Sequence, residues 1–345
     1  METLINPFRG SGMPHPLLDP VPWTADDAGP PQALTARCPL AGQTPLIDAG
    51  ALAAEAGIAS LHIKDERGRM GLGSFKALGA AYVIACDAAA GNVSGRIYVT
   101  ASAGNHGMSV AAGAAAFGAG ARVYIAETVP ESFADRLREQ GADVVRQGDV
   151  YEESMAAAAA AAEREGLVLL SDSSWPGYYD RPHRLMEGYL VLMAEAAAQM
   201  PAPPSHIFLQ AGVGGLAGAC AAYARRVWGD APQIIVVEPE AAPALAASVK
   251  AGAPVVAPGP VSIMGRLDCK EPSLIALKSL ARDADVFMTI SEVEAEDGTA
   301  RVAECGYPST PSGAAGVAAL LTGAGALGLG TDTRAMAILS ETADG

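Results

Sequence analysis

Short β-branched runs alternate with longer alanine-rich stretches along this chain, and the alternation restricts the folds open to it. The β-branched runs lie at 97–100, 121–126, 142–147, 166–171, 205–210, 233–239, 284–290 and 335–340. Strands separated by helical segments favour βαβ units and mainly parallel sheets flanked by helices. Alanine is the strongest helix former, so the alanine-rich stretches 152–163 and 211–227 are expected to be packed helices. The predicted fold class is α/β.

Length and charge limit the partners of the chain. Its 345 residues, half of them hydrophobic, are enough for one large or two medium soluble domains. No apolar stretch reaches the roughly 18 residues of a membrane span, and the N-terminus lacks the basic start and apolar core of a secretion signal. A cytoplasmic protein is therefore expected. The net charge of −15 offers no basic surface to nucleic acid, so an anionic ligand needs a local pocket of backbone N–H groups or a few placed cations.

The cysteines argue against both a disulfide framework and a zinc site, and no metal is expected. Their number is odd, they are widely spread, and they lack CxxC or Cys/His spacing. Reduced thiols are predicted at Cys38, Cys86, Cys220, Cys269 and Cys305.

Three segments rich in proline and glycine interrupt the pattern. Residues 5–40 are expected to wrap over another part of the molecule or of a second subunit. Residues 172–182 and 252–265 are expected to carry domain crossings or active-site loops.

The first segment with chemistry surrounds Lys76. Gly71 and Gly73 precede Ser74, Phe75 and Lys76, where a helical pattern begins. A lysine at a helix start faces the positive end of the helix dipole, which favours the neutral amine. A neutral amine is what Schiff-base formation with an aldehyde cofactor requires. The alternative is an ordinary solvated surface lysine.

The second segment follows the run 97–100. Ser102, Gly104, Asn105 and His106 open a helix, and the exposed N–H groups there suit the carboxylate of a substrate. Asn105 can also offer its amide to a phenolic oxygen. The alternative is a plain helix N-cap, and His106 is expected to be structural rather than catalytic.

The third segment is a glycine-rich turn after the run 205–210. Gly212, Val213, Gly214 and Gly215 allow close approach of the backbone to a ligand just before a helix, which is a geometry for binding phosphate. The turn lacks the Lys and Ser/Thr of a nucleotide P-loop and is too short for a dinucleotide fingerprint.

The order and spacing of these three segments resemble the fold type II pyridoxal phosphate (PLP) enzymes, which include threonine and serine dehydratases, serine racemase and threonine synthase. The resemblance extends from about residue 43 to residue 340. Within that group the chain is most similar to the diaminopropionate ammonia-lyases. The similar segments are TPLIDAGALAAEAGI, KDERGRMGLGSFKALGAAY, GNHG, SDSSWPGYYDRP, MEGY, QAGVGG, VVEPE and IMGRLDCKEPS.

The resemblance implies an architecture like that of the tryptophan synthase β-subunit, with two domains. Residues 1–88 and 186–345 would form the large cofactor-binding domain, and residues 89–185 a smaller mobile domain. A homodimer is usual in the group and is expected here.

The resemblance also implies roles for individual residues. PLP would form a Schiff base with Lys76, and Phe75 would pack by the cofactor. Asn105 would bind the ring oxygen O3′, and the backbone of 212–215 would bind the phosphate. Ser340 would face the pyridine nitrogen. A serine hydroxyl cannot keep that nitrogen protonated, so the ring is a weak electron sink, which favours expulsion of a β-leaving group.

Asp172 and Ala103 bear on the leaving group. An amine leaving group must depart protonated, so a nearby acid is useful. By resemblance, Asp172 matches the carboxylate that ammonia-lyase relatives carry before a Trp-x-Gly-Tyr segment. The alternative is that Asp172 is an ordinary turn or N-cap aspartate. Relatives usually read Asp-Gly-Asn-His where this chain has Ala103. The missing second carboxylate argues against racemisation and against use of D-isomers.

Three functions remain open from the sequence. The first is PLP-dependent α,β-elimination on a small L-amino acid, in which Lys76 removes the Cα proton and a 2-oxo acid and ammonia result. The second is a hydroxyamino-acid (threonine, serine or hydroxyaspartate) dehydratase or β-replacement synthase of the same fold. The third is a non-catalytic amino-acid or PLP-binding protein. Asp172 favours the first, Ala103 favours the second, and Lys76 argues against the third.

Overall fold

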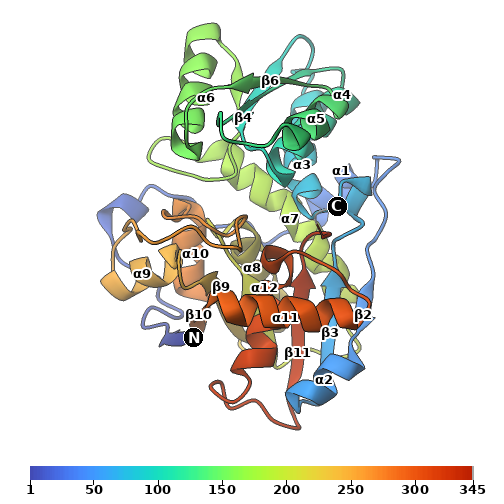
Figure 1. Cartoon of the computed structure of the whole chain (residues 1–345), viewed down its shortest axis with the longest axis vertical. Coiled ribbons are helices and arrows are strands. Elements are labelled where there is room, and N and C mark those ends of the chain that lie inside the picture. Colours follow the sequence, from blue (N-terminus) through green and yellow to red (C-terminus); the bar gives the residue numbers. More distant parts are fainter. Residues whose placement is uncertain (344–345) are drawn as a thin grey trace.

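Two separate β-sheets organise residues 1–343, which this computed structural model describes (Figure 1). The larger sheet has the strand order β1-β10-β9-β8-β11-β3-β2, and the smaller has the order β6-β5-β4-β7. The strands are β1 Glu2–Ile5, β2 Leu46–Asp48, β3 Ser60–Asp65, β4 Ile97–Ala101, β5 Gly120–Ile125, β6 Ala142–Arg146, β7 Val168–Leu169, β8 His206–Gln210, β9 Gln233–Pro239, β10 Val286–Ile290 and β11 Arg334–Leu339.

Parallel pairing dominates both sheets, which confirms the α/β class. The small sheet is parallel throughout. In the large sheet only the edge strands β1 and β2 pair antiparallel with their neighbours, while the inner strands are parallel. All the β-branched runs form strands. The sequence reasoning missed β1, β2 and β3.

Helices and short 3-10 turns connect and cover the sheets. The 3-10 turns are η1 Pro16–Leu18 and η2 Arg69–Gly71. The helices are α1 Gly29–Thr35, α2 Gly50–Ala56, α3 Lys76–Ala89, α4 Asn105–Ala116, α5 Glu131–Glu139, α6 Tyr151–Glu165, α7 Asp180–Gln199, α8 Gly215–Trp228, α9 Ala244–Ala251, α10 Leu274–Asp283, α11 Glu292–Glu304 and α12 Pro311–Gly323. None of those in the described part of the chain is both long and apolar enough to cross a membrane.

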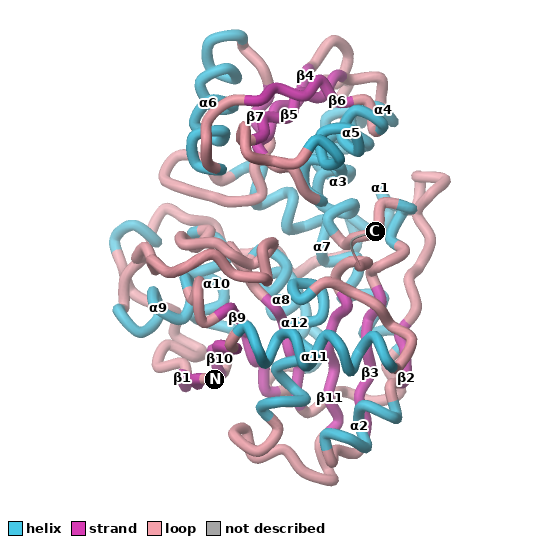
Figure 2. The backbone as a smooth tube through the Cα atoms, in the orientation of Figure 1, coloured by secondary structure: helices cyan, strands magenta, loops and turns pink. Residues whose placement is uncertain are grey.

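Both faces of the large sheet are buried under helices, as Figure 2 shows. Alternate residues of β9 belong to different cores: Ile234 and Val236 pack with α7, α8 and α10, whereas Ile235 and Val237 pack with α11 and α12. Strands buried on both faces read as continuous apolar runs, which is why this strand was evident in the sequence. The small sheet is likewise covered by α6 on one face and by α4 and α5 on the other.

The early segment, residues 6–45, is mostly irregular. Its first part lies against α10, and α1 lies against α3 and α7. The sequence predicted that residues 5–40 wrap over another part of the molecule or of a second subunit. The Asn6 amide donates to the carbonyl of Ala281 at 2.8 Å. Lys278 in turn donates to the carbonyls of Leu18 (2.8 Å) and Val21 (2.7 Å). These side-chain bonds satisfy backbone carbonyls that have no strand or helix partner.

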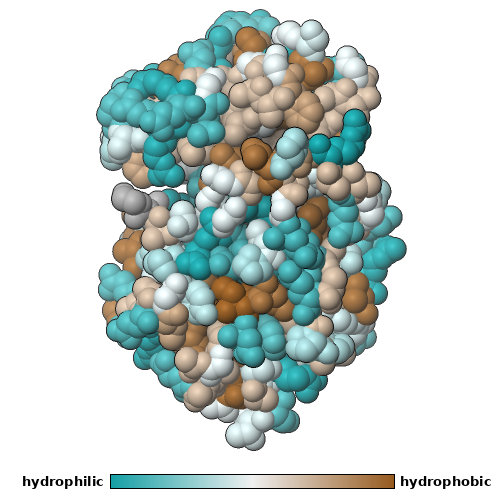
Figure 3. Space-filling view, turned by 90° about the vertical axis from the view of Figure 1, so that its right-hand side faces the viewer, coloured by the Kyte–Doolittle hydropathy of each residue, from teal (hydrophilic) through white to brown (hydrophobic). Residues whose placement is uncertain are grey.

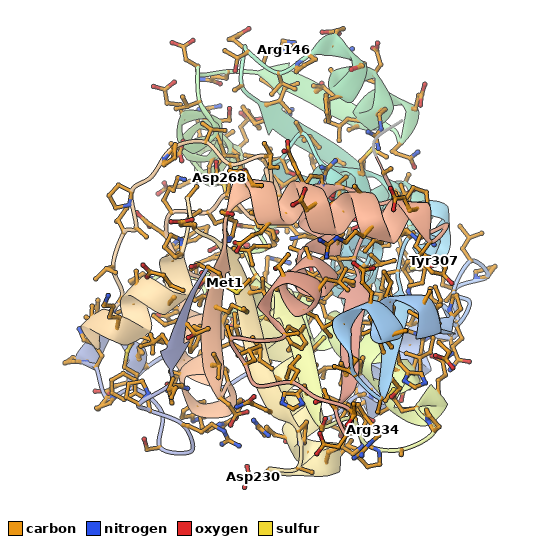
Figure 4. The ribbon with its side chains drawn as sticks, turned by 60° about the horizontal axis from the view of Figure 1, so that its bottom comes forward. Met1, Arg146, Asp230, Asp268, Tyr307 and Arg334 are labelled. Carbon is orange, nitrogen blue, oxygen red and sulfur yellow. The ribbon has the colours of Figure 1, made fainter. Side chains whose placement is uncertain are left out.

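The small sheet with α4, α5 and α6 forms one unit, here called the small-sheet unit, and the surface narrows between it and the rest (Figure 3). The carboxyl ends of the large sheet's parallel strands point toward this unit. Figure 4 shows this polarity, because Arg334, where β11 begins, lies at the end remote from the small-sheet unit, whereas Asp268 lies near it. Ligands of open α/β sheets bind at the carboxyl ends of strands.

Helices α3 and α7 join the two parts through an unusually close crossing. A Cβ added to Gly188 of α7 would lie 2.5 Å from the carbonyl oxygen of Leu78, and one added to Gly79 of α3 would lie 2.7 Å from Cε1 of Tyr189. Glycines on facing turns therefore let the two backbones approach. Because α3 begins at Lys76, this crossing also sets where that lysine stands.

Replacing Gly188 by alanine is expected to destabilise the protein by about 1–3 kcal/mol, the usual cost of overpacking. The new methyl group meets a backbone oxygen that cannot rotate away. Alanine's greater helix propensity, worth about 1 kcal/mol, opposes the loss. Urea unfolding measures the difference, with Gly325→Ala as the control, because nothing lies within 4 Å of that exposed position. Equal stability of Gly188→Ala and the unsubstituted protein would contradict the close-crossing argument.

Candidate functional site

Lys76 is the first residue of α3, and the segment before it is tied to the end of β11. The backbone N–H of Phe75 donates to the carbonyl of Ser340 at 3.1 Å, and Ser74 forms an isolated antiparallel bridge with Glu341. Gly73 adopts a φ of +75°, and an added Cβ there would lie 3.1 Å from Thr342. The residues that follow β11, an inner strand of the large sheet, thus hold the turn that presents Lys76.

The Lys76 ammonium forms an ion pair with the Asp172 carboxylate, and both groups are largely buried. Although burial opposes the charge, the Asp172 carboxylate raises the pKa of Lys76 well above its ordinary value. Burial likewise opposes the Asp172 charge, but Lys76 lowers the pKa of Asp172 well below its usual range. The prediction of a neutral amine from the helix dipole is therefore wrong, because the neighbouring carboxylate outweighs the dipole.

Asp172 is held by the segment that follows β7, rather than acting as a helix cap. The rings of Trp175 and Tyr178 stack at 4.4 Å and 15°, and the Tyr178 hydroxyl donates to the carbonyl of Leu169 at 2.9 Å. Ser174 shares a hydrogen bond of 2.7 Å with Ser273, which lies outside the small-sheet unit. These contacts fix the tight turn from which the Asp172 side chain reaches Lys76.

The second segment forms a tight turn into α4, with Gly104 as the N-cap. The Ser102 hydroxyl accepts from the N–H of Gly104 at 3.3 Å, and a Cβ on Gly107 would lie 2.1 Å from the Ser102 carbonyl oxygen. The His106 ring is buried and bonds to the carbonyl of Leu170 at 2.9 Å. Burial lowers the pKa of His106, so the ring is neutral and holds the turn to β7, in agreement with a structural role.

Asn105 contacts a residue that the sequence reasoning did not single out. Its amide donates to the carboxylate of Glu341 at 2.5 Å. Glu341 is only 4% exposed, and Arg266 pairs with it at 3.1 Å. The adjoining Ser340 is buried as well. This cluster lies where the small-sheet unit meets the carboxyl end of β11.

The third segment forms a glycine-lined turn at the start of α8. A Cβ on Gly212 would lie 3.0 Å from the Cys269 sulfur. Gly214 has a φ of +99°, and a Cβ there would lie 2.9 Å from Cβ of Ala276. The carbonyl of Val213 accepts from Ser273 at 3.0 Å. A side chain would be crowded at positions 212 and 214 of this turn, and the 14-residue helix beginning at Gly215 directs its free N–H groups and positive dipole end at the turn.

Tyr189 links the first and third segments and was not predicted as a site residue. Its ring lies edge-on to Phe75, with centroids 4.9 Å apart, and its Cε2 would be 3.6 Å from a Cβ on Gly215. The Tyr189 hydroxyl is buried and has no hydrogen-bond partner among residues 1–343. A buried donor without a partner calls for a ligand, so the site fits a bound group with polar atoms between α3 and α8.

The three segments therefore converge at the carboxyl end of the large sheet, facing the small-sheet unit. Lys76 forms an ion pair with Asp172. Tyr189 lies between Phe75 and the turn 212–215. Asn105 donates a hydrogen bond to Glu341, just beyond the end of β11. The thiol of Cys269 borders the same space, and burial raises its pKa to about 12, so it remains protonated and is a poor nucleophile. No cluster of metal-binding side chains occurs in the part of the chain that the structure describes.

Comparisons with known proteins agree with this geometry. The family model "Pyridoxal-phosphate dependent enzyme" matches residues 38–341. Diaminopropionate ammonia-lyase of Salmonella typhimurium is 33% identical over 312 residues, which cover 80% of this chain and 77% of that protein. The mouse L-serine dehydratase/L-threonine deaminase is 31% identical over 73% of this chain and 74% of its own length.

A solved structure matches nearly the whole chain. The crystal structure of diaminopropionate ammonia-lyase from Escherichia coli in complex with an aminoacrylate-PLP azomethine reaction intermediate superposes with a TM-score of 0.88. Its sequence identity to this chain is 27%, and the match covers 99% of this chain and 93% of the other.

Asp172→Asn is expected to shift the pH dependence of PLP attachment to lower pH. Attack on the aldehyde of PLP requires a neutral amine. Asparagine removes the charge that raises the lysine pKa, while the burial that lowers it remains. Because one pKa unit changes the neutral fraction tenfold, attachment near pH 7.5 should accelerate at least about tenfold.

Stopped-flow absorbance across pH measures this rate, with the exposed Asp180→Asn as the control from the same region. Identical pH profiles for Asp172→Asn and the unsubstituted protein would show that Asp172 does not govern the lysine charge.

Proposed function

Because the chain belongs to the family of pyridoxal-phosphate-dependent enzymes, we propose that it is an ammonia-lyase that uses PLP for α,β-elimination on a small L-amino acid. The products are a 2-oxo acid and ammonia. Two relatives in this family, at 33% and 31% identity, are diaminopropionate ammonia-lyases. The observation that carries the proposal is the direct pairing of Lys76 with Asp172, because elimination of an amine needs one group to remove a proton and another to supply one.

PLP fits the space between α3 and α8. When bound, it supplies an aldehyde that condenses with an amine and a ring that draws electrons from Cα. We propose that Lys76 holds the aldehyde carbon and that Phe75 packs against the ring. The backbone of 212–215 would bind the phosphate, Asn105 the phenolic oxygen, and Ser340 the pyridine nitrogen. The glycine-lined turn and the unpartnered Tyr189 hydroxyl support this arrangement.

The two catalytic groups would divide the proton transfers. The Lys76 amine, once displaced by the substrate, accepts the Cα proton. Although burial opposes its charge, Asp172 has a low pKa as long as Lys76 is charged beside it. When the amine is engaged and that charge is gone, burial remains and raises the carboxyl pKa. Asp172 can then take up the proton that the substrate ammonium loses as its nitrogen displaces Lys76, and it passes this proton to the departing amine.

The turn into α4 would hold the substrate carboxylate. We propose that the backbone around Ser102 and Gly104, with Asn105 and His106 behind it, forms this subsite. No side chain caps the N-terminus of α4, so its N–H groups and positive dipole end are available to an anion. Ala103 offers no second carboxylate on this side, which supports action on L-isomers.

Domain motion is part of the proposal. We propose a large cofactor-binding domain of residues 1–88 and 186–345 and a smaller mobile domain of residues 89–185. The small sheet lies within residues 89–185. Asn105 and Asp172 belong to the small domain, whereas Lys76 belongs to the large one, so an opening motion would separate these groups to admit the substrate, and closure would exclude water.

We further propose a cytoplasmic homodimer. All five cysteines are free thiols, which suits a reducing compartment. Large apolar side chains such as Val261 (88% exposed) and Ile5 (80% exposed) lie open on the surface, and a subunit contact would cover such groups.

A dehydratase of hydroxyamino acids or a β-replacement synthase is the second candidate, and Ala103 favours it. Both candidates use Lys76 in the same way. They differ in the leaving group, so a comparison of substrates distinguishes them. The release of 2-oxo acid and ammonia is assayed with L-diaminopropionate, L-serine, L-threonine, 3-hydroxyaspartate and O-acetylserine.

Lys76→Ala should abolish turnover and the adduct that borohydride traps. The unsubstituted protein with PLP should absorb near roughly 410–420 nm, as expected for the cofactor bound to a lysine. Mass spectrometry after borohydride reduction locates the modified residue, with the exposed Lys250→Ala as control. A reducible adduct in Lys76→Ala would assign the cofactor to another lysine.

Asp172→Asn should lower kcat for an amine leaving group by about two to four orders of magnitude, the usual range for a positioned acid. KM should change less, because protonation of the leaving group matters most in the transition state. Steady-state kinetics with L- and D-diaminopropionate measure both effects. A fully active Asn variant, or comparable turnover of the D-isomer, would favour the dehydratase or synthase.

A further inference from the structure

Glu341 is a buried carboxylate with several fixed contacts at the end of the large sheet. It lies two residues after the end of β11 and forms a bridge with Ser74, which stands two residues before Lys76. The Ser309 hydroxyl donates to the Glu341 carbonyl at 2.6 Å. Glu341 is only 4% exposed, and burying a charged carboxylate costs free energy unless the group is paired and hydrogen-bonded. Its partners should therefore compensate for that cost.

Both oxygens of this carboxylate accept hydrogen bonds. The Thr310 hydroxyl donates to Oε1. Thr310 also accepts from the backbone N–H of Gly313 at 2.9 Å, which fixes the position of its oxygen. Arg266 Nε (3.1 Å) and Asn105 Nδ2 (2.5 Å) both face Oε2. The arginine charge and the two donors all suit a group that only accepts hydrogen bonds, as a carboxylate does.

An ionised carboxylate determines which way the Asn105 amide faces. A carboxylate only accepts hydrogen bonds, whereas an amide has a donating NH2 end and an accepting oxygen end. The Asn105 amide must therefore turn its NH2 group to Glu341. That group carries two N–H bonds, and only one is used by Glu341.

We infer that Glu341 is a positioning residue that orients Asn105 so that its second N–H donates to the phenolic oxygen of bound PLP. The inference rests on the proposed function. A reversed amide would place its oxygen against the phenolic oxygen, where two acceptors repel each other. The preset orientation avoids that state and favours the anionic phenolate, since a donor stabilises the charged form.

The same contact joins the two sides of the site. Asn105 begins α4 of the small-sheet unit, whereas Glu341 and Thr310 belong to the large part. Thr310 is the N-cap of α12, to which its hydroxyl also bonds. Hydrogen bonds therefore connect α12 to Thr310, Thr310 to Glu341 and Glu341 to Asn105. These bonds fix the position of Asn105, on the small-sheet unit, relative to the large sheet.

Substitutions at Glu341 separate orientation from charge. Glutamine can place its oxygen toward Asn105 and its NH2 group toward the Thr310 hydroxyl, so Glu341→Gln should bind PLP within about threefold of the unsubstituted protein. Glu341→Ala frees the amide, so it should weaken PLP binding about tenfold. It should also reduce, by at least about twofold, the phenolate absorption near roughly 410–420 nm per bound cofactor. Glu304→Ala, which removes an exposed carboxylate from α11, is the control.

A double-mutant cycle tests whether Glu341 acts through Asn105. Adding Glu341→Ala to Asn105→Ala should weaken PLP binding no further, since contacting residues that act as a unit are not additive. PLP titration, absorption spectra and urea unfolding of the cofactor-free proteins give the readouts. If Glu341→Ala does not fold, Glu341→Met fills the volume without accepting a hydrogen bond and takes its place.

The outcomes distinguish this inference from the proposed function. An unsubstituted protein that forms no absorbing PLP adduct would overturn both. A normal adduct together with unchanged binding and absorption in Glu341→Ala would overturn the inference alone. So would additive losses in the double variant, or a Gln variant as impaired as the Ala variant, because the carboxylate would then act through its charge rather than by orienting the amide.

Discussion

A buried network of two cations and two carboxylates holds the segment that leads to Lys76. Arg69 donates to both Glu66 (2.7 Å) and Glu195 (2.7 Å), and Lys64 donates to Glu195 at 2.8 Å. All four side chains are at most about one-tenth exposed. The network joins β3, the 3-10 turn η2 and helix α7. Removing one member of such a network typically costs about 3–5 kcal/mol, because an unpaired charge stays buried.

This network explains how a loop can present Lys76 with a fixed geometry. The chain passes from β3 through η2 to α3 within a few residues, and Met70 there adopts a φ of +50°, a conformation that costs free energy in residues other than glycine. Arg69 anchors one end of that segment, and the crossing of α3 with α7 through Gly188 anchors the other. Glu195 and Gly188 both lie on α7, so this one helix contacts both ends of the segment and fixes its position.

The sequence predicted those parts of the structure that depend on local pattern. Doubly buried strands such as β9 appear as continuous apolar runs, and the glycine-rich turn before α8 stands out by composition. Strand β3 was missed because Lys64 and Asp65 make it look polar, although Lys64 is fully buried in the charge network. Contacts between distant positions leave no local pattern either. The pairing of Lys76 with Asp172, 96 residues apart, and that of Asn105 with Glu341, 236 residues apart, follow only from the topology.

The electrostatics of the site suit an anionic ligand in an acidic protein. Lys76 is neutralised by Asp172 and Arg266 is paired with Glu341, so these cations add little net positive charge to the site. Attraction for an anion must then come from the backbone N–H groups at the starts of α4 and α8, which carry partial positive charge without a counterion. Such groups are fixed by the helices and need no reorganisation when a ligand binds. Their attraction is also short-ranged, so a chain with a net charge of −15 can bind an anion tightly at one point while it repels polyanions elsewhere.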